Sequence, residues 1–115
     1  MDGRVQLPVI KYLQEYFKAE YVDSITEAGP VAVLAEQTNN ILLESVLSRL
    51  KISVERHNSV GIAIVAHHDC AGNPAPKEKQ LKQLTGAVRL IREEYGTPEV
   101  VGLWVNEKWQ VQLIP

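Results

Sequence analysis

The sequence predicts an α/β protein, a three-layer α/β/α arrangement in which helices cover both faces of a mostly parallel central sheet. Segments with the 3.6-residue apolar period of helices alternate along the chain with short β-branched runs that are typical of strands. Residues 60–66 contain no polar side chain, as expected of a strand that is buried on both faces. Strands that alternate with helices form βαβ units and therefore a mainly parallel sheet.

Composition narrows the class of protein further. The 115 residues suffice for a single domain, 1–115, and a 45% apolar content can supply its core. The net charge of −2 and the lack of a basic block argue against nucleic acid as a partner. A single cysteine excludes an intramolecular disulfide and suits a reducing compartment, so we expect a cytoplasmic protein. We expect neither a signal peptide nor a membrane partner, since no run approaches about 20 apolar residues.

The first half of the chain predicts one helix, one strand and then two more helices. Residues 7–18 have a helical stripe, and residues 21–26 have the composition of a short strand that ends before Gly29 and Pro30. Residues 31–56 are helical in character but long. Three poor helix formers at 38–40 divide them, so we expect a short helix and a longer one from about Asn40.

The second half predicts one strong helix and a C-terminal hairpin. Residues 77–95 repeat apolar side chains at alternating three- and four-residue spacing, and Gly96 is well placed as a left-handed cap. Residues 99–105 predict a strand, and residues 109–114 predict a strand that returns antiparallel after a turn. We expect Trp104 and Trp109 in the core or in a subunit interface.

Polar side chains with metal-binding chemistry follow the buried strand directly. His67, His68, Asp69 and Cys70 come at its end, and a loop that begins at Gly72 follows. In open α/β folds the carboxyl edge of the sheet is where ligands bind. His67 and Cys70 are three residues apart and can turn toward one point, and imidazole with thiolate is a pair that favours zinc. A buried cysteine beside a hydrogen-bonded histidine is the structural alternative.

His67-x-x-Cys70 after a buried strand resembles the second half of the zinc site of β-class carbonic anhydrases. The first half in that family is C-x-D-x-R at the end of the first strand. Residues 1–4, Met-Asp-Gly-Arg, match x-D-x-R and lack only the cysteine, which would directly precede Met1. The resemblance therefore implies a first strand that ends in cysteine upstream of Met1.

The resemblance also implies an activity and a set of site residues. Zinc would lower the pKa of a bound water to about 7, and the resulting hydroxide would hydrate carbon dioxide reversibly to bicarbonate. Asp2 and Arg4 correspond to the catalytic pair, in which the arginine holds the carboxylate that orients the zinc-bound water. His67 and Cys70 correspond to metal ligands. Asp2 is the candidate third ligand where the first cysteine is lacking.

Several alternatives stay open at this point. His68 or Asp69 could also be recruited as a ligand. A single cysteine cannot complete a Cys-His-Cys site within one subunit, which favours a non-catalytic, oligomerising α/β module with a vestigial or regulatory metal site. A flavodoxin-like ligand-binding domain is a third possibility, but no Gly-rich phosphate loop follows any strand. Family members associate, so we expect a homodimer or a higher homo-oligomer.

Overall fold

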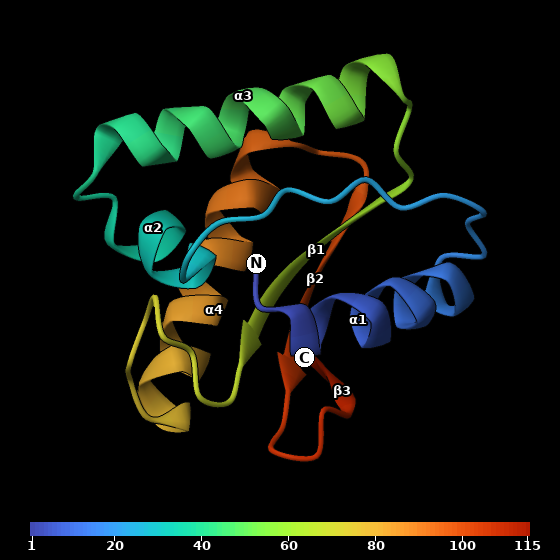
Figure 1. The fold of residues 1–115 in the computed structure, drawn as a ribbon. Coiled ribbons are helices and arrows are strands. Elements are labelled where there is room, and N and C mark those ends of the chain that lie inside the picture. The colour runs from blue at the N-terminus through green and yellow to red at the C-terminus, as the bar shows by residue number, and fades with distance from the viewer.

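The computed structural model describes all residues 1–115 as four helices and a three-stranded mixed sheet (Figure 1), which confirms the α/β class. In chain order the elements are α1 (Gly3–Tyr16), α2 (Pro30–Glu36), α3 (Asn40–Arg56), β1 (Gly61–His67), α4 (Lys77–Glu94), β2 (Glu99–Val105) and β3 (Val111–Ile114). None of the helices is both long enough and apolar enough to cross a membrane.

The sheet has the order β1-β2-β3, so β1 is an edge strand with a neighbour on one side only. β1 and β2 run parallel and pair from Gly61 with Glu99 to His67 with Val105. β3 returns antiparallel to β2, as the hairpin signals predict, although it begins at Val111 and is two residues shorter than expected. The register places the carboxyl ends of the two parallel strands, His67 and Val105, side by side.

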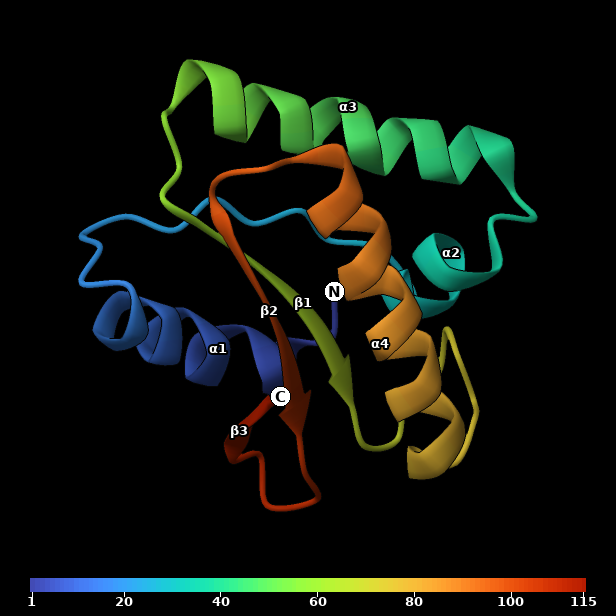
Figure 2. The same ribbon diagram turned by 180° about the vertical axis from the view of Figure 1, so that it is seen from behind.

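The core consists of two clusters that lie on the two faces of the sheet. The larger cluster includes Ile62 and Ile64 from β1 and side chains of α2, α3 and α4. The smaller cluster joins Val5 and Val9 of α1 to Leu103 and its neighbours in β2. Figures 1 and 2 show α1 on the opposite side of the strands from α4. Helices thus pack on both sides of the sheet, but β1 is buried mainly on one face, because Gly61, Ala63 and Val65 are only half-buried.

α1 begins at Gly3 instead of at residue 7, so this predicted boundary is wrong. The side chain of Asp2 accepts a hydrogen bond of 2.9 Å from the backbone N–H of Arg4 and so caps the helix before its first turn. Pro8 consequently lies inside the helix and not at its start. The predicted division into two helices is confirmed, because α3 begins at Asn40.

The end of α4 also differs from the prediction. The helix ends at Glu94, and Tyr95 leaves it with an extended backbone, with φ −127° and ψ 118°. Gly96 has no left-handed conformation, so its predicted role as a cap is wrong. The backbone N–H of Tyr95 still bonds to Ile91, and the chain then turns directly into β2.

The prediction of a strand at residues 21–26 is wrong. The segment lies outside helices and strands, and no backbone amide pairs with residues 20–28, although the amino terminus of Met1 donates to Glu27 O. It passes β1 in the same general direction without pairing with it (Figures 1 and 2). The composition indicated a strand, but a strand forms only where a neighbouring strand pairs with it.

Asp23 fastens the beginning of this segment to the end of α3. Its Oδ2 accepts a 2.7 Å bond from Ser53 Oγ and lies 2.6 Å from His57 Nδ1. These two bonds, with that from Ser53 the stronger influence, lower the pKa of Asp23 below its ordinary value of 3.8. The side chain of His57, directly after α3, therefore has the carboxylate of Asp23 as its partner.

The lowered pKa of Asp23 predicts a loss of stability in acid. A carboxyl whose pKa is lower in the folded state stabilises the protein above its unfolded pKa, and this contribution disappears as the pH falls through the folded value. Asp23→Asn should cost about 0.5–1 kcal/mol at pH 7, a modest value because the ion pair is exposed. Urea unfolding at pH 7 and pH 3 should show the variant losing less stability than the parent on acidification. An equal loss in both would contradict the prediction.

Candidate functional site

The predicted site lies at the carboxyl ends of β1 and β2. β1 ends at His67, and the chain leaves it through a tight turn in which Asp69 has a positive φ of 56°. The backbone N–H of His68 donates to Val105 O at 2.9 Å, which fastens this turn to the end of β2. Cys70 follows the turn and is buried. The apolar strand and the turn together bring these residues to one edge of the sheet.

His67 is buried, with 8% of its surface exposed, and the orientation of its ring is fixed. Its Nδ1 lies 2.7 Å from His68 O, and because a carbonyl can only accept, Nδ1 carries the proton and donates it. The other ring nitrogen, Nε2, has no hydrogen-bond partner within the protein. A metal-binding histidine typically donates its second N–H to a backbone carbonyl in this way.

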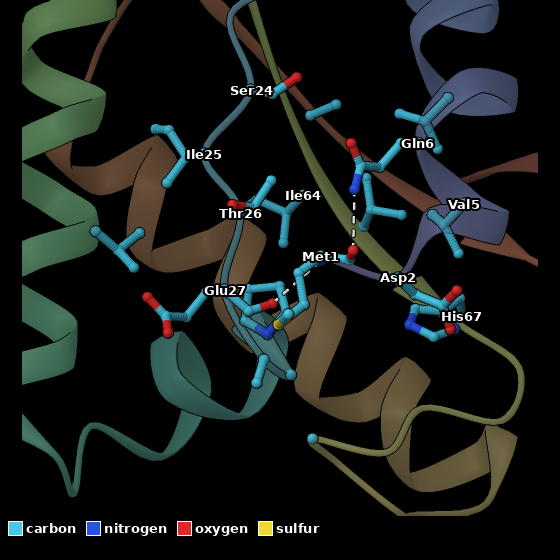
Figure 3. A pocket seen from close by; sticks show the side chains of 18 of the residues that line it. Met1, Asp2, Val5, Gln6, Ser24, Ile25, Thr26, Glu27, Ile64 and His67 are labelled. Atoms are coloured by element: carbon cyan, nitrogen blue, oxygen red, sulfur yellow. Dashed lines mark hydrogen bonds between the residues drawn. The ribbon is translucent and has the colours of Figure 1, made fainter.

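Asp2 and Arg4, the predicted catalytic pair, are bonded to each other at the start of α1. The Arg4 side chain grips the Asp2 carboxylate through Nη2, at 2.7 Å from Oδ2, and through Nε, at 3.1 Å from Oδ1. Hydrogen bonds from the Arg4 side chain and backbone hold the pKa of the Asp2 carboxyl well below its usual range, and His67 lowers it further. Asp2 and His67 line the same cavity (Figure 3). Asp2 is therefore an ionised acceptor at neutral pH.

Arg4 has partners that the sequence reasoning missed. Its Nη1 lies 3.3 Å from Asp69 Oδ2, and its guanidinium carbon lies 4.3 Å from the ring centroid of Trp109. Arg4 thus connects the start of α1 to the turn after β1 and to the β2–β3 turn. Trp109 is half-buried, and no local spacing in the sequence signals its contact with a residue more than a hundred positions away.

Two glutamines of α4 form hydrogen bonds to the end of β1 and to the loop after Cys70, and the sequence reasoning also missed them. Gln80 is buried and donates to His67 O at 3.0 Å and to Ala75 O at 3.1 Å. Gln83 accepts a hydrogen bond of 2.7 Å from the side chain of the buried Asn73, and it donates one of 3.1 Å to the carboxylate of Glu36. The available signal was that both glutamines lie on the apolar stripe of α4, where a polar side chain needs a partner.

A pocket of about 440 Å³ opens beside these residues, and we call it the β1 pocket. Asp2, His67 and Cys70 line its end at the carboxyl edge of the sheet, and Gly29 and Gly72 belong to its wall. The rest of the pocket extends along β1 between α1 and residues 22–28. Of its 28 lining residues, 18 are hydrophobic, so most of it is apolar.

The donor set in this chain does not complete a zinc site. A catalytic zinc needs three protein ligands, and no group of three His, Cys, Asp or Glu side chains lies close enough together to hold a metal ion. His67 and Cys70 are suitable donors, but Arg4 engages both carboxylate oxygens of Asp2. The exposed Asp69 also faces Arg4. The roles of Asp2, His67 and Cys70 as ligands therefore stay predictions.

Comparison with known proteins gives one match. The family model described as "Putative carbonic anhydrase" matches residues 1–115, the whole chain. No curated protein matches, and no solved structure matches.

Proposed function

The chain belongs to this carbonic anhydrase family, and on that premise we propose that it is a β-class-like zinc protein that hydrates carbon dioxide reversibly to bicarbonate. The activity requires a third ligand beside His67 and Cys70. We propose that this ligand is a cysteine joined directly to the amino end of Met1. The proposed partners are carbon dioxide, bicarbonate and a second copy of the chain, and the proposed compartment is the cytoplasm.

One observation carries the proposal: the Arg4–Asp2 pair lies beside His67, although Asp2 is 65 positions from that histidine in the sequence. The Arg4 guanidinium keeps Asp2 ionised, so its carboxylate can accept a hydrogen bond from a water or from a bicarbonate hydroxyl. Nε2 of His67 has no hydrogen-bond partner within the protein. The chemistry of both groups suits the site of a small, hydroxyl-bearing substrate.

A second candidate function follows from the incomplete donor set. Without a third ligand, the chain would be a non-catalytic, oligomerising α/β module with a vestigial or regulatory metal site. The lack of any three-donor group supports this alternative for the 115 residues as they stand. Two donors bind zinc weakly, so the alternative predicts little bound metal and no turnover.

Zinc content and carbon dioxide hydration distinguish the two functions. We would compare the 115-residue chain with versions that carry Cys or Ser joined to Met1, all purified without added metal. The version with cysteine should hold about one zinc per chain and hydrate carbon dioxide, because three ligands and an open position are then present. The version with serine should hold almost none.

Two substitutions in the cysteine version complete the experiment. Cys70→Ser should remove both zinc and activity, whereas His57→Ala, at the far end of α3, should change neither. Zinc without hydration would show that the proposed reaction is wrong. About one zinc on the unextended chain would show that Asp2 or another group replaces the cysteine.

A further inference from the structure

Gln80 holds the peptide group that directly follows His67. Its Nε2 donates to His67 O at 3.0 Å, and the N–H of the same peptide group, which belongs to His68, donates to Val105 O at 2.9 Å. The peptide group is therefore bound on both of its edges, by a side chain of α4 and by the end of β2. A peptide group that is held in this way cannot rotate without the loss of a buried hydrogen bond.

This peptide group sets the orientation of the His67 ring. His67 Nδ1 donates at 2.7 Å to His68 O, the next carbonyl along the chain. Rotation of the peptide group between the two histidines would move this carbonyl and deprive Nδ1 of its acceptor. The Gln80 amide also donates to Ala75 O at 3.1 Å, so it holds the far end of the loop that carries Cys70. One buried side chain thus fixes both ends of the segment with the two candidate ligands.

The second buried glutamine of α4 has a different kind of partner. Gln83 lies three residues after Gln80 and is 8% exposed, against 1% for Gln80. Its hydrogen bonds go to the side chains of Asn73 and Glu36 and not to the backbone. Gln83 therefore supports the loop through a side chain, whereas Gln80 binds the backbone that orients His67.

Gln80 and Trp104 each have one buried polar atom without a partner in the protein. Because both acceptors of Gln80 Nε2 are carbonyls, the orientation of the amide is fixed, and Oε1 is the atom that stays free. Trp104 Nε1 is the complementary group, an indole donor on a residue that is 2% exposed. Buried polar groups of this kind are normally satisfied, often by an ordered water.

Trp104 and Gln80 lie at the same end of the sheet. Trp104 pairs with Ala66, the residue before His67, and belongs to the core cluster on the α4 face. Lys77, about one turn before Gln80 in α4, has its Nζ 5.6 Å from the centroid of the Trp104 ring. The free indole N–H and the free carboxamide oxygen therefore belong to the same layer, between the first turn of α4 and the ends of β1 and β2.

We infer that Gln80 is a positioning residue for His67, and that Trp104 orients the Gln80 amide through one buried water. In this arrangement the indole N–H donates to the water, and the water donates to Gln80 Oε1. Nε2 is then directed at His67 O, and the imidazole ring keeps one orientation. The inference rests on the proposed function only in taking His67 as a site residue. Its test measures the histidine ring and not turnover, so either can fail without the other.

Nuclear magnetic resonance of the 115-residue chain at pH 7 tests the inference. The His67 Nδ1 proton should give a slowly exchanging signal, because it is buried and bonded to a carbonyl, and the signal is assigned by its loss in His67→Gln. Gln80→Met replaces the amide with an apolar chain of similar length, and it should speed the exchange of this proton by about tenfold or more. Gln83→Met, the matched control, should leave the exchange rate unchanged.

The two methionine variants separate positioning from packing. Each removes one buried carboxamide from α4, so a general loosening of the helix would speed the exchange of the His67 proton equally in both. Equal effects, or an unchanged His67 signal in Gln80→Met, overturn the inference. Faster exchange in Gln80→Met alone supports it.

Two measurements on the unsubstituted chain complete the test, and they hold even if Gln80→Met does not fold. The carboxamide protons of Gln80 should exchange about tenfold or more slowly than those of the exposed Gln112, because the Gln80 amide is bonded to two backbone carbonyls. The Trp104 indole proton should show a nuclear Overhauser effect to a long-lived water. Equal exchange of the two carboxamides overturns the role of Gln80, and an indole proton without a water contact overturns the role of Trp104.

Discussion

Gly29→Ala should destabilise the protein by about 2–5 kcal/mol. Gly29 has φ +59°, a left-handed conformation that costs an alanine about 1–2 kcal/mol. The added Cβ would also lie 2.7 Å from Gly72 O and 2.8 Å from Gly72 C, which are backbone atoms. Such crowding typically costs a further 1–3 kcal/mol. The neighbouring loop cannot move aside cheaply, because Asn73 is buried and bonded to Gln83.

Urea unfolding followed by circular dichroism measures the effect of Gly29→Ala. Gly96→Ala is the matched control, because Gly96 has no positive φ and no atom within 4 Å of an added Cβ. We expect the control to stay within about 0.5 kcal/mol of the parent, as is usual for surface changes. A loss below about 1 kcal/mol for Gly29→Ala would show that the contact between the loops is not as close as described.

Leu103→Ala should cost about 2–5 kcal/mol, the usual range for a buried leucine. Leu103 lies in the middle of β2, has no exposed surface and packs with Val5 and Val9 of α1. Truncation would leave a cavity between the sheet and the helix that carries Asp2. Domains of this size are stable by only about 5–15 kcal/mol, so the variant would lose a large share of its stability.

Leu113→Ala provides the control for this prediction. Leu113 pairs with Leu103 across the β2–β3 ladder but is 43% exposed. We expect a loss below about 1 kcal/mol, because less apolar surface leaves contact with the protein. Equal losses for the two leucines in urea unfolding would contradict the described burial of the α1 face.

Periodicity in the sequence predicted most of the elements because their burial is regular. β1 and β2 are apolar runs, and β2 has the predicted bounds. The errors occur where one contact outweighs the pattern. Asp2 caps α1 earlier than the apolar stripe indicates, and residues 21–26 have the composition of a strand but no partner to pair with. Pairing partners are a property of the tertiary structure, so composition alone could not supply the second result.

The candidate site was predictable in part for a similar reason. His67 and Cys70 follow a buried strand, so their position at the sheet edge could be inferred from local sequence. Asp2 and Arg4 were associated with them by a motif, and the structure places Asp2 beside His67. The contacts of Arg4 with Trp109 and of Asn73 with Gln83 depend on the packing of distant elements, and no local pattern encodes them.

The hydrogen bonds of Asn73 have a consequence for how small molecules reach the site. Asn73 binds Gln83 of α4, Gln83 binds Glu36 of α2, and Gln80 binds Ala75 farther along the same loop. The loop after Cys70 is therefore a fixed wall and not a hinged lid. Entry and exit at the carboxyl edge of β1 are then set by the shape of a permanent opening, so their rates should follow diffusion and not a conformational gate.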